Sequence, residues 1–156
     1  MSELKTLINN YAAPGRIKWI GLRPERLADL VSVDTAYITE GGLEGDHRMR
    51  PGKRAVTVIQ WEHLPVIASL VGADAVDPGQ LRRNIAISGI NLLGMRNRKF
   101  RLGEAVLEGT GLCAPCSRME ETLGNGGYAA TRGHGGITAS VITPGRIKTG
   151  DRLVPL

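Results

Sequence analysis

The sequence predicts a mostly β fold, a β-barrel with a few short peripheral helices. Many short runs of alternating or β-branched residues follow one another at close spacing, and long helical patterns are scarce. The 21 glycines supply turns between these runs. This pattern favours a barrel over a series of strand–helix–strand units. We expect a single domain over residues 1–156, with its core at about 16–156 and residues 1–15 as an N-terminal extension.

The strand with the clearest pattern covers residues 55–60, which are nearly all apolar or β-branched, so we expect it to be central. Further strands are expected at residues 16–21, 31–38, 85–88, 99–102, 105–108, 137–142 and 152–154. Two helices are expected, at residues 61–71 and 116–123. Turns at residues 77–79, 103–104, 143–146 and 150–151 separate these elements.

Composition argues against secreted disulfide-rich proteins, membrane proteins and nucleic-acid-binding proteins. The chain contains two cysteines, which argues against a secreted disulfide framework. No signal peptide or apolar stretch of membrane-spanning length is visible, so we expect a soluble cytoplasmic protein without a membrane partner. The net charge is +5, which is compatible with nucleic-acid binding. Aromatic residues make up only 4% of the chain, however, and this argues against binding through base stacking.

The basic residues form separate clusters rather than one tail. Arginine forks suit phosphate, so clusters that converge in the fold can bind one anionic small ligand, although each cluster alone can also be solvated surface. The clusters are Arg48, Arg50, Lys53 and Arg54; Arg82 and Arg83; and Arg96, Arg98, Lys99 and Arg101. Asn84 follows the second cluster at the start of a predicted strand, where these three side chains can clamp a phosphate or an amide.

A glycine-rich loop at residues 41–48 presents Asp46, His47 and Arg48 together. An aspartate beside a histidine can act as a base or as a positioning pair. The same residues can also be polar decoration of an ordinary turn.

Both cysteines, Cys113 and Cys116, lie between a predicted strand and a predicted helix. A thiol at a helix start meets free N–H groups and the positive end of the helix dipole, and both favour the thiolate. Arg118 adds positive charge nearby. The Cys-x-x-Cys spacing allows a dithiol redox centre, half of a zinc site completed by His134, His47 or a carboxylate, a single functional cysteine, or two structural thiols.

Three stretches together resemble the MOSC family, which is named after the C-terminal domain of molybdenum cofactor sulfurase. Residues 42–47 resemble its Gly-Asp-x-His loop, although His47 follows Asp46 directly, and residues 82–89 resemble its Arg-x-Asn-Ile segment. Residues 103–108 followed by 115–118 resemble the segment that bears the family cysteine. The likeness extends over roughly residues 16–156.

The resemblance implies a β-rich barrel that binds the molybdenum cofactor (molybdopterin), a pterin dithiolene with a terminal phosphate. The family cysteine matches Cys116, which would be the metal ligand of an oxidoreductase that reduces small N-oxygenated compounds, or alternatively a carrier of cofactor or persulfide sulfur. Arg82, Arg83 and Asn84 would hold the cofactor, while Asp46, His47 and Arg118 would line its pocket. An electron-donor or cofactor-delivery protein is an implied partner. The family is also associated with pyridoxal phosphate binding, and this association rests on the resemblance alone and not on particular residues of the sequence.

Overall fold

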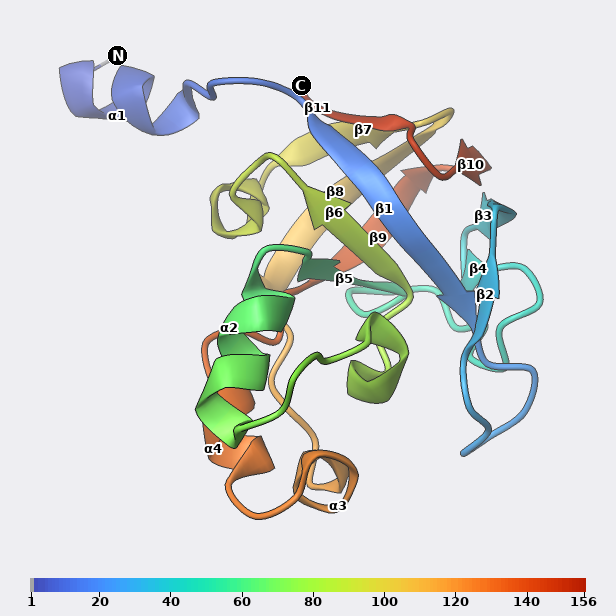
Figure 1. The fold of residues 1–156 in the computed structure, drawn as a ribbon. Coiled ribbons are helices and arrows are strands. Elements are labelled where there is room, and N and C mark those ends of the chain that lie inside the picture. Colours follow the sequence, from blue (N-terminus) through green and yellow to red (C-terminus); the bar gives the residue numbers. More distant parts are fainter. Residues whose placement is uncertain (1) are drawn as a thin grey trace.

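The computed structural model describes residues 2–156, and seven of its strands close into a barrel (Figure 1). The hydrogen-bonded order is β11-β7-β8-β9-β5-β6-β1, and β11 pairs back onto β1 to close the ring. β2 (Val31–Val33) extends the sheet beyond β1. The barrel strands are β1 (Gly15–Leu22), β5 (Val56–Gln60), β6 (Ile85–Ser88), β7 (Lys99–Leu102), β8 (Ala105–Leu112), β9 (Ile137–Thr143) and β11 (Arg152–Pro155).

A second sheet of three strands packs against the barrel core. It contains β10 (Gly145–Lys148), β3 (Thr35–Thr39) and β4 (Gly42–Leu43), and its apolar side chains join the main core cluster. The prediction of one strand over residues 31–38 was wrong, because the chain changes sheets at Asp34, whose carbonyl accepts the Thr149 N–H. The expected turn at residues 143–146 is likewise shorter, because β10 begins at Gly145.

The helices are short and lie outside the barrel, as predicted, but they are more numerous than the two expected (Figure 1). α2 (His63–Val71) follows β5 and crosses to the parallel strand β6. The others are α1 (Glu3–Asn9), α3 (Arg118–Leu123), α4 (Gly127–Thr131) and the 3-10 helices η1 (Pro78–Leu81) and η2 (Leu92–Met95). Across residues 2–156, none of the helices has the length and apolar character needed to cross a membrane.

β5 and β6 are buried on both faces, which explains why their sequences are mostly apolar rather than alternating. Val58 and Ile85 point into the barrel core, whereas Ile59 and Ala86 pack under α2 in a second cluster. Met119 of α3 belongs to this second cluster and is fully buried. The apolar layer under α2 therefore also anchors the segment that follows the two cysteines.

Candidate functional site

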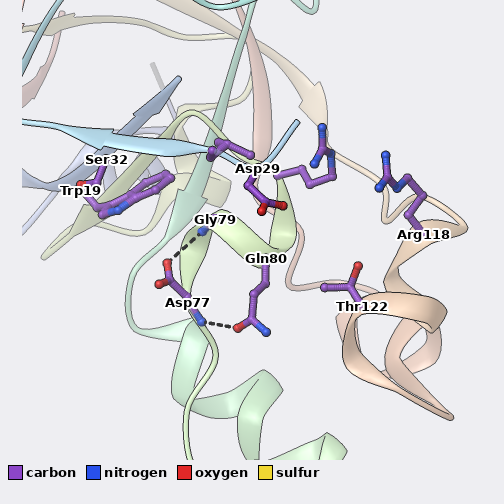
Figure 2. A pocket seen from close by; sticks show the side chains of 10 residues that line it. Trp19, Asp29, Ser32, Asp77, Gly79, Gln80, Arg118 and Thr122 are labelled. Carbon is purple, nitrogen blue, oxygen red and sulfur yellow. Dashed lines mark hydrogen bonds between the residues drawn. The ribbon is translucent and has the colours of Figure 1, made fainter. Parts of the chain in front are cut away.

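A pocket of about 390 Å³ opens between η1, α3 and the strands β1 and β2. Figure 2 shows Arg118 and Thr122 of α3 on one side and, on the other, Gln80 of η1 with Asp77, the residue that caps η1. Asp77 and Gln80 form a capping box, in which the Asp77 carboxylate accepts the Gly79 N–H and the Gln80 side chain accepts the Asp77 N–H. The remaining lining comes from Trp19, Asp29, Leu30, Ser32, Gly79 and Arg82.

The pocket lining carries two arginines, Arg82 and Arg118, and two aspartates, Asp29 and Asp77. The Nη1 atom of Arg82 donates to the Ala28 carbonyl at 3.0 Å. The Nη1 atom of Arg118 is buried and has no hydrogen-bond partner among the described residues. An unsatisfied buried donor is costly, and a charged one more so, so this atom is the strongest local indication that the pocket accepts an anion.

Other charges converge near Arg82. Burial lowers the pKa of Arg82, and the positive charges of Arg118 and then Arg23 lower it further. Cys116 and Asp29 act in the opposite direction. A guanidinium stays protonated under these influences, so the shift reports burial and then crowding of positive charge rather than a change of state. It also places the Cys116 thiol within electrostatic reach of the pocket arginines.

The two cysteines differ in exposure. Cys116 is exposed, whereas Cys113 is only 4% exposed, and both are free thiols. The predicted helix start at Cys116 was two residues early, because α3 begins at Arg118 after Ser117. The Cys116 carbonyl still accepts the Met119 N–H at 3.0 Å. The accessible thiol therefore sits on the loop just ahead of the helix.

Arg83 holds this cysteine loop from inside the protein. Its guanidinium donates to four main-chain carbonyls, those of Leu81, Cys113, Ala114 and Gly135, at 2.8–3.4 Å. Arg83 is 5% exposed, so its charge is shielded from solvent and neutralised by carbonyl dipoles. The bonds to Cys113, Ala114 and Gly135 tie the η1–β6 region to the segments around the cysteines, whereas the bond to Leu81 stays within that region.

Asp46 and Asn84 form a second buried network. Asp46 accepts hydrogen bonds from Arg23 and from the Nδ2 atom of Asn84. Asn84 also donates to the Gly21 carbonyl and accepts from the hydroxyl of Thr57. Each polar atom finds its partner within the protein, so the network joins β1, β5 and the loop after β4.

The histidines named by sequence lie away from this pocket's lining. His47 is exposed, and its main-chain N–H donates to the Arg23 carbonyl. His134 faces His63 instead of the cysteines. Within residues 2–156 no three His, Cys, Asp or Glu side chains are grouped to hold a metal ion, so the zinc alternative for the two cysteines finds no support.

Sequence reasoning missed several lining residues. Trp19, Asp29, Ser32 and Thr122 carry no local motif, because each comes from a different element and they meet only in the fold. The position of Arg23 was the one sequence feature that could have pointed to it. Arg23 directly follows the end of β1, where it bonds the Asp46 carboxylate of a neighbouring loop. Asp77 appeared only as a turn residue.

Solved structures share this fold. The chain matches the YuaD protein from Bacillus subtilis with a TM-score of 0.79 and 19% identity, covering 90% of this chain and 94% of that one. It matches YiiM from Escherichia coli with a TM-score of 0.70 and 23% identity, over 90% and 69% of the two chains. For YiiM from Geobacillus stearothermophilus the TM-score is 0.75 and the identity 18%, over 92% and 75%. A comparison with curated proteins finds no match.

Fold and site together define a closed β-barrel protein with an accessible thiol near a polar pocket that two arginines line. The MOSC domain model matches residues 39–154, and the chain belongs to the MOSC domain family. That family is associated with the molybdenum cofactor. The barrel and the short peripheral helices predicted from the sequence are thereby confirmed.

Proposed function

We propose that this protein binds the molybdenum cofactor, with the phosphate-bearing end in the pocket of Arg82 and Arg118. The observation that carries the proposal is the buried, unpartnered Nη1 atom of Arg118 in the lining of that pocket. Guanidinium groups bind phosphate through paired, charge-assisted hydrogen bonds, which would satisfy this donor. The donor set of the pocket therefore fits the anionic part of the cofactor.

Cys116 is the proposed metal ligand. It is the exposed thiol of the chain, and it lies within electrostatic reach of Arg82. A thiolate is a soft ligand and suits metal centres that prefer sulfur. Arg83, Asn84 and Asp46 have a supporting role in this proposal, since their hydrogen bonds fix the cysteine loop and the neighbouring strand ends. His47 is exposed and lies outside the pocket lining, so it has no assigned role in this proposal.

The reaction we propose is the reduction of small N-hydroxylated or N-oxygenated compounds. When bound, the cofactor supplies a metal centre capable of two-electron oxygen-atom transfer. Reduction of an N-hydroxy group consumes two electrons and two protons and releases water, so an electron-donor protein is the implied partner. The chain itself binds the cofactor, orients it and places positive charge beside its phosphate.

The test is metal analysis of protein expressed in a host that makes the cofactor. We expect about one molybdenum per chain in the wild type, loss of molybdenum in Cys116→Ser, and a marked fall in Arg118→Met. Arg54→Met is the matched control, because Arg54 is exposed and lies outside the lining of this pocket and of the one beside the cysteines. Molybdenum retained at full occupancy by both Cys116→Ser and Arg118→Met would refute the proposal.

A second candidate function is that of a sulfur or cofactor carrier. The exposure of Cys116 beside a buried Cys113 favours it, because a carrier needs one thiol that a donor can reach. A persulfide sulfur on a cysteine desulfurase would pass to the Cys116 thiolate, and the desulfurase cysteine would leave as a thiol. Mass spectrometry should then show one added sulfur in the wild type and none in Cys116→Ser. No added mass in either would exclude the carrier.

A further inference from the structure

Two histidines meet on the side of the barrel covered by α2 and α4. His63 is the first residue of α2, and His134 follows α4. Their Nδ1 atoms are 3.4 Å apart, and their rings are nearly perpendicular, at 86°, with centroids 4.9 Å apart. Both side chains are half-buried, so neither is an ordinary solvated surface residue.

The separation of the two nitrogens fits a shared metal ion better than a direct hydrogen bond. Hydrogen bonds from N–H groups have donor–acceptor distances of roughly 2.7–3.2 Å, so 3.4 Å is long for one. Two imidazole ligands at about 2.0–2.1 Å from one tetrahedral ion have nitrogens about 3.4 Å apart. The observed spacing equals this value without any movement of the main chain.

The carboxylate next to the pair is bonded elsewhere. The Glu62 carboxylate is already engaged by the side chain of Gln60 and the N–H of Gly89, so it leaves the two histidines facing each other.

We infer that His63 and His134 together bind one divalent ion of the imidazole-preferring class, such as Zn²⁺, Co²⁺ or Ni²⁺. Since residues 2–156 contain no group of three His, Cys, Asp or Glu ligands, water molecules complete the coordination. The site is therefore open and reversible rather than a closed structural centre. This inference does not depend on the molybdenum cofactor.

The two residues that follow His134 are hydrogen-bonded to the cysteine loop and to Arg83, which holds that loop. His134 precedes Gly135, whose carbonyl accepts the Nε–H of Arg83, and Gly136, whose carbonyl accepts the Cys113 N–H. A Cβ at Gly136 would collide with the Val58 carbonyl, which fixes this segment tightly against β5. A metal ion on His134 would thus hold the segment that supports the cysteine loop.

Calorimetric titration with Co²⁺ tests the inference, and it is best done in a Cys116→Ser background to remove the accessible thiol. The chain has three histidines, so His47→Gln is a matched control for His63→Gln and His134→Gln. We expect one binding event in the parent and in His47→Gln, and at least about tenfold weaker binding in the other two. Mg²⁺, which prefers oxygen ligands, should give no binding.

Binding that is equally strong in all three histidine variants, or no Co²⁺ binding in the parent, would overturn the inference. Circular dichroism establishes that each variant is folded. If a variant does not fold, proton NMR of the parent replaces it. Co²⁺ should then broaden the ring signals of His63 and His134 before that of the exposed His47, and simultaneous broadening of all three would refute the site.

Discussion

The Asp46 carboxylate accepts the main-chain N–H of Arg23 at 2.6 Å and, through its other oxygen, lies 3.2 Å from the guanidinium of the same arginine. The Asp46 side chain is 2% exposed and that of Arg23 is 14% exposed. This ion pair joins the loop after β4 to the end of β1. It also leaves Arg23 close enough to Arg82 for its charge to be felt there.

Replacement of Asp46 by alanine should destabilise the protein by about 3 kcal/mol, because it leaves the Arg23 cation and several N–H donors without a partner. Urea unfolding measures the change. Glu44→Ala is the control, since Glu44 is exposed in the same loop and should cost little. Equal losses for the two variants would show that the buried pair contributes nothing.

Arg83→Lys should destabilise the protein by roughly 3 kcal/mol or more, because a lysine cannot reach four diverging carbonyls with one ammonium group. The cysteine loop should loosen as well, and the buried Cys113 should become reactive toward a thiol reagent. Thermal unfolding and thiol titration measure the two effects. Arg54→Lys, at an exposed position, should change neither.

Thiol labelling of the native protein should show one rapidly reacting cysteine, Cys116, because Cys113 is 4% exposed. Cys116→Ser should abolish the fast phase and leave only slow labelling through local opening. In denaturant, both thiols of the wild type should react at the same rate. A persistent fast phase in Cys116→Ser would mean that Cys113 is accessible in the native protein.

The His63–His134 pair should make stability fall in mild acid. The pKa of His63 in the folded protein lies below its ordinary value of 6.5, mainly because of burial and then the charge of His134. The folded state therefore binds fewer protons than the unfolded chain, and stability is lost as pH falls from 6.5 through the lowered pKa. His63→Gln should flatten this part of the stability profile, measured with a chelator present to exclude metal ions. An unchanged profile would contradict the shift.

Much of the fold could be predicted because burial on one or both faces marks a strand clearly. β6 has the predicted bounds, and β5 differs by one residue, since both are apolar on each face. The break between β2 and β3 could not be predicted, because the residues on either side of Asp34 continue the same alternating pattern. Only the pairing with other strands separates them.

The residue types of the site could be predicted from the sequence, but the direction in which each side chain points could not. Arg82 and Arg83 are adjacent and chemically identical, yet Arg82 lines the pocket while Arg83 points to buried carbonyls. The left-handed conformation of Arg82, with φ of 60°, turns the chain between the two arginines. The sequence does not predict this conformation, because arginine has no preference for it. α4 was missed because five residues beginning with glycine carry no periodic pattern.

The closure of the barrel sets the order of events during synthesis. β1 lies at the beginning of the fold and β11 at its end, yet Gly15 pairs with Leu153 and Arg16 with Arg152. A ribosome must therefore deliver nearly the whole chain before these two strands can meet. Until then β1 and β7 each present an unpaired edge, the kind of surface on which neighbouring nascent chains associate.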